Sequence, residues 1–230
     1  MLYLTDVFGI ALNENKLCAI HLLPLPSPSS SILTHIPSLA DSFARAGYLT
    51  LAPDLFDGAP APSDLNAPGF NATDFAAKHP PAVQDAIIAA TVQYMHQTLG
   101  LDQIFATGYC WGGRYVFRFL APSKGAESVD AGFAAHPSLL QTDEIKAIGG
   151  PVSVAAADHD ELMPAATRLE LEELLLGTGK PYQVTLYSGT QHGFGVRADM
   201  ADRQQRFGKE GAFLQAVRWF DWFLEGGEDK

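Results

Sequence analysis

Three side chains that together can cleave an acyl bond lie far apart in this sequence, at Cys110, Asp158 and His192. A cysteine thiolate is a strong nucleophile, an imidazole can accept and return its proton, and a carboxylate can hold the imidazole in the required tautomer. The three residues follow one another in the order nucleophile, acid, histidine. They are therefore a candidate triad for hydrolysing a carboxylic ester.

The cysteine lies in a pattern typical of a nucleophile elbow, Gly-Tyr-Cys-Trp-Gly-Gly at residues 108–113. The apolar run before it, residues 104–106, predicts a buried strand, and the apolar spacing of residues 115–120 predicts a helix. Small residues on either side let the backbone turn sharply between the two. The helix N-terminus favours a thiolate, and the Trp111 amide is expected to face a developing oxyanion. The alternative is a buried free cysteine beside a glycine-rich turn.

Asp158 and His192 each follow a predicted strand, at residues 151–157 and 182–187. In a parallel sheet the carboxyl ends of the strands share one edge, which is where ligands bind. Alternatives remain for each partner. Asp158 could cap a helix, His159 could replace His192 as the base, and His136, which follows another predicted strand, is expected to play a structural hydrogen-bonding role.

The rest of the sequence alternates strands with helices and predicts an α/β fold, a doubly wound, mostly parallel sheet flanked by helices in one domain over residues 1–230. Further strands are expected at residues 1–7, 48–52 and 129–135, and helices at 38–46, 81–99, 165–176 and 204–224. The helix at 81–99 is expected to turn Val83, Ile87, Ala90 and Tyr94 inward. Residues 59–81, rich in Pro, Ala and Asp, are expected to form a surface excursion near the site.

Composition narrows the function classes. The chain has 230 residues and a formal net charge of −11, which argues against nucleic acid or an anionic membrane as the main partner. Two cysteines form no disulfide framework, and no cluster has the spacing of a zinc site, so neither a metal nor a cofactor is expected. No signal peptide and no apolar run long enough to span a membrane is found, which indicates the cytoplasm.

Several motifs resemble the dienelactone hydrolase family, especially its fungal members. They are Asp6-Val7-Phe8-Gly9, Gly47-Tyr48, Pro53-Asp54-Leu55-Phe56, the segment around Cys110, Asp158-His159-Asp160 and Gln191-His192-Gly193-Phe194. The resemblance implies an α/β-hydrolase fold, a triad of Cys110, His192 and Asp158, and oxyanion donors at the amides of Val7 and Trp111. It also makes Asp6 a candidate contact of the resting thiol and Arg197 a candidate contact of a substrate carboxylate. Asp6 is shorter than the glutamate of the bacterial enzymes, and Arg197 is offset by one position.

The resemblance also predicts two departures in the first 39 residues. Family members usually carry further residues ahead of Met1, so the chain is expected to be shortened at its N-terminus. Residues 18–39, apolar and rich in proline, have no counterpart in the family and are interpreted as an insert, with translated intron sequence as the hypothesis.

The sequence thus predicts a hydrolase for a small-molecule lactone or other activated ester, acting as a monomer or dimer. A general carboxylesterase or thioesterase on the same triad is the alternative within enzymes. A catalytically silent homologue that binds small carboxylic ligands is the alternative outside them.

Overall fold

The protein is described from a computed structural model over residues 1–11 and 39–225, so the insert expected at 18–39 lies outside the described residues except for Leu39. Its strands are β1 (Leu2–Leu4), β2 (Phe105–Tyr109), β3 (Ala131–Ala135), β4 (Val152–His159) and β5 (Tyr182–Gln191). Its helices are α1 (Leu39–Arg45), α2 (Ala72–Lys78), α3 (Pro81–Gln97), α4 (Trp111–Phe119), α5 (Thr142–Lys146), α6 (Ala165–Thr178), α7 (Phe194–Arg197) and α8 (Arg203–Glu225), with short 3-10 turns at Gly9–Ala11 and Pro122–Glu127.

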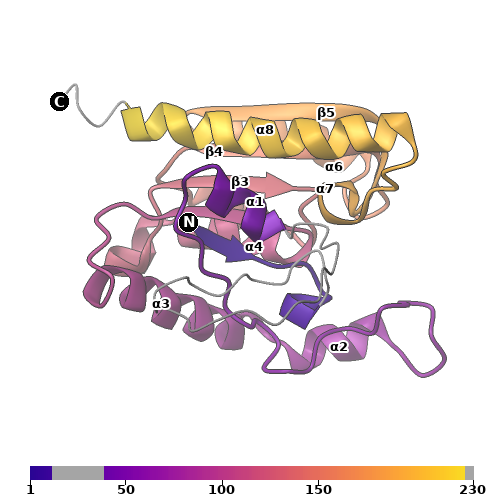
Figure 1. Ribbon diagram of the computed structural model, residues 1–230, viewed down its shortest axis with the longest axis horizontal. Helices are drawn as coiled ribbons and strands as arrows, with labels where there is room; N and C mark the ends of the chain where they lie inside the picture. The colour runs from indigo at the N-terminus through magenta and orange to yellow at the C-terminus, as the bar shows by residue number, and fades with distance from the viewer. Residues whose placement is uncertain (12–38, 226–230) are drawn as a thin grey trace, which may run out of the picture.

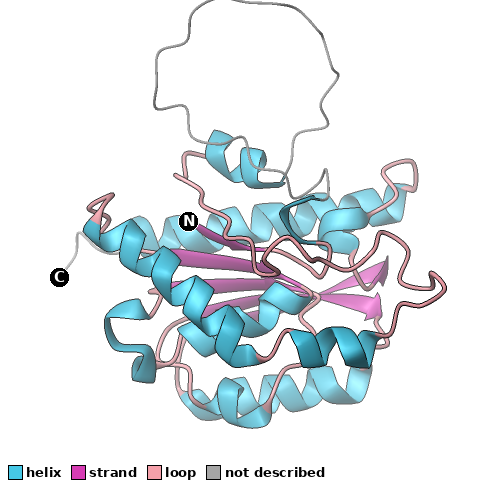
Figure 2. Ribbon diagram, turned by 90° about the horizontal axis from the view of Figure 1, so that it is seen from below, coloured by secondary structure: helices cyan, strands magenta, loops and turns pink. Residues whose placement is uncertain are grey.

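The five strands form one sheet in the order β1-β2-β3-β4-β5, and each neighbouring pair is parallel. Helices lie on both sides of the strands (Figure 2). The expected α/β fold with a parallel, helix-flanked sheet is therefore confirmed. Because all five strands run the same way, their carboxyl ends meet along one edge.

The N-terminal part of the sheet is shorter than the sequence predicted. β1 ends at Leu4 because the next carbonyl, that of Thr5, accepts a hydrogen bond from the Gly112 amide of α4 instead of pairing with a strand. Residues 48–52 form only a single bridge, Leu51 beside Leu2. Pro53, two residues further on, has no N–H to extend such a ladder.

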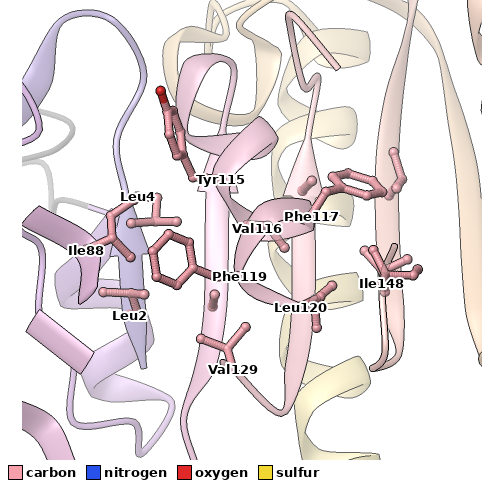
Figure 3. Close-up of a cluster of buried hydrophobic side chains, with 14 of the residues drawn as sticks. Leu2, Leu4, Ile88, Tyr115, Val116, Phe117, Phe119, Leu120, Val129 and Ile148 are labelled. Carbon is pink, nitrogen blue, oxygen red and sulfur yellow. The ribbon is translucent and has the colours of Figure 1, made fainter. Parts of the chain in front are cut away.

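Two apolar cores fill the space between sheet and helices. One contains Leu2, Leu4, Ile88 and side chains of α4 such as Val116 and Phe119, and it joins the sheet to α3 and α4 (Figure 3). The other lies on the opposite face and contains aromatic side chains of the strands, α1 and α8: Tyr3, Phe43, Phe105, Tyr109, Phe133 and Phe220. α8 runs along β4 and β5 on that face (Figure 1). The sheet is thereby held from both sides.

The buried face of α3 is shifted by one or two positions from the face that the sequence predicted. Gln84, Ile88, Val92 and Met95 are buried, whereas Val83 and Tyr94 are 45% and 44% exposed. The buried stripe contains a glutamine whose amide nitrogen donates to the Leu55 carbonyl at 3.1 Å. Because this inward position is polar, the spacing of hydrophobic residues alone does not identify the buried face of the helix.

The excursion at residues 59–81 contains α2. Asn71, the residue before this helix, is its N-cap: the side-chain oxygen accepts from the amides of Thr73 and Asp74 at 2.8 and 3.0 Å. Phe75 of this helix packs against Trp111 at the start of α4, with ring centroids 5.8 Å apart. The excursion therefore packs beside the segment that carries Cys110.

The N-terminus of α4 approaches the sheet so closely that only glycine fits. A Cβ on Gly112 would lie 2.3 Å from the Leu4 carbonyl oxygen, and a Cβ on Gly108 would lie 2.5 Å from the Gly112 carbonyl oxygen. Both contacts are with backbone, which cannot rotate away. Glycine at these positions thus sets how deeply the helix sits.

We expect Gly112→Ala to lower the free energy of unfolding by about 1–3 kcal/mol, the usual cost of overpacking. Gly177→Ala is the matched control, because a Cβ there meets nothing within 4 Å. The control should be neutral or stabilising by up to about 1 kcal/mol, since alanine favours helix over glycine. Urea unfolding midpoints measure both, and equal stability of the two variants would contradict the close-approach argument.

Candidate active site

Cys110 occupies a sharp turn between β2 and α4. Its φ and ψ angles are 49° and −110°, a conformation that a residue with a side chain rarely adopts. The strand before it is fully buried, and the helix begins at the next residue. A strained residue between a buried strand and a helix has the backbone geometry of a nucleophile elbow.

Backbone hydrogen bonds hold this strained turn in place. The Cys110 amide donates to the Ala135 carbonyl at 3.1 Å, and the Cys110 carbonyl accepts from the amides of Gly113 at 3.1 Å and Ser138 at 3.0 Å. Two of these partners come from the end of β3 and the loop after it. Strain of this kind costs of order 1–3 kcal/mol and persists where surrounding structure fixes it.

The imidazole of His192 lies between the sulfur and a carboxylate. Its Nε2 is 3.0 Å from Cys110 Sγ, and its Nδ1 is 2.9 Å from both carboxylate oxygens of Asp160. The side chain of Asp160 is fully buried, and one of its oxygens also accepts from the amides of Leu162 and Met163 at 2.9 and 3.1 Å. Sulfur, imidazole and carboxylate therefore form one hydrogen-bonded line.

The carboxylate in this line is Asp160, whereas the sequence pointed to Asp158. β4 continues through His159, two residues beyond the predicted end, so Asp158 still belongs to the strand and Asp160 is the first residue after it. Asp158 instead accepts from the Gly189 amide at 3.2 Å, where β5 bulges opposite it. The signal that could have identified Asp160 is the Asp-x-Asp spacing, which offers a carboxylate on each side of the strand end.

The charge on His192 follows from its neighbours. Burial alone disfavours the imidazolium, but the hydrogen bonds and charges of Asp160 and Cys110 outweigh it and raise the pKa of His192 to about 9. The ring therefore carries a proton at neutral pH. The protonated ring can then donate a hydrogen bond from Nε2 to the sulfur, 3.0 Å away.

The other two histidines weighed from the sequence take different places. The side chain of His159 is 74% exposed and lies 3.7 Å from Asp158. His136 is fully buried, with its ring edge-on to His192 at a centroid distance of 5.0 Å. Burial lowers the pKa of His136 well below its usual value, and the nearby positive charges of His192 and Arg197 add to that effect. The His136 ring is thus uncharged and packs against the imidazole of His192. The hydrogen-bonding role expected for His136 is not seen, because neither of its ring nitrogens has a partner among the described residues.

The two expected oxyanion donors belong to neighbouring segments. Trp111 is the first residue of α4, so its amide is among those that have no carbonyl to bond within the helix. Val7 lies in the loop after β1, and the Gly112 amide bonds to that loop at the Thr5 carbonyl. The Val7 carbonyl accepts from Ala61 at 2.9 Å, which fixes the orientation of the loop from its other side.

Asp6 and Arg197 form an ion pair beside the site. The carboxylate of Asp6 is fully buried and accepts from the Arg197 guanidinium and, at 3.2 Å, from the Phe8 amide. The Arg197 side chain is 28% exposed, and its guanidinium lies over the Phe8 ring at 4.5 Å. The buried Asp6 thus holds a partly exposed arginine five residues after His192 in the chain, and its guanidinium lies so close to Gly193 that a Cβ there would be 2.4 Å from Nη2.

Within residues 1–11 and 39–225, no group of three or more His, Cys, Asp or Glu side chains is arranged to hold a metal ion. No helix in the same part of the chain is long and apolar enough to cross a membrane.

Comparisons with known proteins agree on one family. A sequence model of the dienelactone hydrolase family matches residues 31–224. Hydrolase pyvD of Aspergillus violaceofuscus is 40% identical over 225 residues, covering 98% of this chain and 81% of the relative. Dienlactone hydrolase 1 of Gibberella moniliformis is 30% identical and covers 83% and 75%. The crystal structure of a dienelactone hydrolase-like promiscuous phosphotriesterase from metagenomic libraries has the same fold, with a TM-score of 0.62, 17% identity and coverage of 96% of this chain and 84% of that one.

NMR titration tests which carboxylate acts on His192. We expect its ring signals to titrate near pH 9, and we expect the midpoint to fall in Asp160→Asn, because the amide removes the negative charge that favours the imidazolium. Asp158→Asn is the matched control and should leave the midpoint in place. A shift in the control and none in Asp160→Asn would reverse the assignment.

Proposed function

Since the chain belongs to the dienelactone hydrolase family, we propose that it hydrolyses a lactone or another activated carboxylic ester, with Cys110 as nucleophile, His192 as base and Asp160 as the orienting acid. The observation that carries the proposal is the single line from sulfur through imidazole to carboxylate, with contacts of 3.0 and 2.9 Å. These distances lie within the range that proton transfer requires.

In the first half of the reaction the sulfur attacks the ester carbonyl carbon and its proton resides on His192. The carbonyl oxygen becomes an oxyanion, which the amides of Val7 and Trp111 are proposed to stabilise. One such donor is typically worth about 10²–10³ in rate. His192 then gives its proton to the leaving alkoxide, and a thioester on Cys110 remains. In a lactone the leaving oxygen stays tethered to the acyl group.

In the second half water attacks the thioester. His192 takes a proton from the water, a second oxyanion forms in the same place, and the sulfur leaves as the carboxylic acid is released. Asp160 keeps Nδ1 protonated throughout, so that Nε2 faces the reacting atoms. The buried carboxylate and its two backbone donors support this fixed orientation.

Arg197 is proposed to contact a substrate carboxylate. The Arg197 side chain is partly exposed, its guanidinium lies beside Gly193, the residue after His192, and the buried Asp6 holds it. Arginine offers paired donors that match the two oxygens of a carboxylate. An acidic ester or lactone is accordingly the favoured substrate class.

A general carboxylesterase or thioesterase would use the same residues and differ only in the acyl and leaving groups it accepts. A silent binding homologue would not need a sulfur within hydrogen-bond distance of an imidazole. The observed 3.0 Å contact favours the enzyme.

Turnover of p-nitrophenyl acetate tests the triad. We expect Cys110→Ala and His192→Ala each to lower kcat by at least about 10³-fold, because the members of a triad act as a unit. Asp160→Asn should lower kcat by about 10²–10⁴-fold, because without the carboxylate the His192 ring can adopt the wrong tautomer. Asp158→Asn, the matched control, should retain activity. A folded wild type with no turnover would support the binding homologue instead.

The role of Arg197 is tested with a neutral and an anionic ester, p-nitrophenyl acetate and mono-p-nitrophenyl glutarate. Replacing Arg197 alone would strand the buried Asp6 carboxylate, so Asp6→Asn is compared with Asp6→Asn/Arg197→Gln. We expect KM for the anionic ester to rise about 10- to 100-fold in the double variant, the worth of hydrogen bonds between charged groups, and KM for the neutral ester to stay the same. Equal changes for both esters would exclude a carboxylate contact.

A further inference from the structure

The sulfur of Cys110 has a second side-chain neighbour besides His192. The hydroxyl oxygen of Ser138 lies 3.6 Å from Sγ, within hydrogen-bond range for sulfur. Ser138 is only 3% exposed, and among the described residues its hydroxyl makes this one hydrogen bond. A buried hydroxyl costs free energy unless its proton reaches an acceptor. The sulfur is the acceptor that the fold provides.

Backbone contacts fix the hydroxyl in this place. Ser138 follows β3 by three residues, and its amide donates to the Cys110 carbonyl at 3.0 Å. The amide therefore holds the strained turn, and the side chain of the same residue contacts the nucleophile. Because a substitution at position 138 leaves the amide in place, the two contributions can be separated.

The direction of the hydrogen bond depends on whether the sulfur carries a proton. His192 is protonated at neutral pH and its Nε2 faces the sulfur. A sulfur that has given up its proton can only accept hydrogen bonds. Beside such a sulfur the Ser138 O–H is the donor, whereas beside a thiol either atom could donate.

We propose that the Ser138 hydroxyl donates a hydrogen bond to the Cys110 thiolate and, opposite His192, stabilises and positions the nucleophile. The inference rests on the proposed role of Cys110 as nucleophile. It adds a donor from the loop after β3 that the sequence motifs did not indicate. In the resting protein the sulfur would then have two donors, one charged and one neutral.

The rate at which iodoacetamide alkylates Cys110, measured from pH 3 to pH 10 by peptide mass spectrometry, tests this directly, because only the thiolate reacts. We expect the midpoint of the profile to rise by about one pH unit in Ser138→Ala, with about a tenfold slower rate below the midpoint. Cys18 in the same samples is the internal reference for the reagent.

Matched variants control for packing. Ser153→Ala removes another fully buried serine hydroxyl, bonded to Gln183 and Gln215 and distant from the sulfur in the hydrogen-bond network, and should leave the profile unchanged. Ser138→Thr and Ser138→Val have nearly the same shape and differ in the hydroxyl. The threonine variant should keep the wild-type midpoint, and the valine variant should have a raised midpoint, as Ser138→Ala does. This pair decides the question even if Ser138→Ala does not fold.

The outcomes distinguish this inference from the proposed function. A midpoint that stays or falls in Ser138→Ala and in Ser138→Val, with ester turnover intact in the wild type, overturns the role of Ser138 alone; a fall would mean that the thiol donates to the hydroxyl. A raised midpoint without any ester turnover supports Ser138 and overturns the hydrolase. Cys110 alkylated no faster than Cys18 overturns both.

Discussion

The site depends on how closely the N-terminus of α4 packs against the sheet. Gly108 and Gly112 bring backbone against backbone at distances that leave no room for a Cβ. The helix therefore begins directly at the end of β2, and the residue between them must take the strained conformation of Cys110. Hydrogen bonds to Ala135, Gly113 and Ser138 hold it there. The close packing of α4 against β1 and β2 thus determines where Cys110 lies.

Two carboxylates at the carboxyl end of β4 have different roles in placing the imidazole. Asp158 bonds to the Gly189 amide and holds the bulge of β5, which brings the end of that strand beside the end of β4. Asp160, after the strand, binds the imidazole and the amides of its own turn. One carboxylate shapes the strand ends, and the other sets the orientation and charge of His192.

Uncharged and charge-paired side chains surround Cys110, His192 and Asp160, which strengthens the electrostatic interactions among these three residues. His136 stands against His192 without charge, and the buried Asp6 is neutralised by Arg197. Phe56 and Phe75 pack on Trp111, the residue after Cys110. In buried surroundings of low dielectric constant, the charged hydrogen bond between His192 and Asp160 is stronger than it would be on an exposed surface. The aromatic packing around Trp111 and the Asp6–Arg197 ion pair therefore both affect the electrostatics of the site.

Local patterns in the sequence were sufficient for the alternation of strands and helices, for the elbow at Cys110 and for His192, because each depends on residues close together in the chain. Three features needed the tertiary structure. The inward face of α3 includes Gln84, whose burial depends on the distant Leu55 carbonyl. The choice of Asp160 over Asp158 depends on how far β4 pairs with β5. The contact of Ser138 with Cys110 forms because the ends of β2 and β3 lie side by side at one edge of the sheet. The residue spacing within either segment does not indicate which distant segment it will contact.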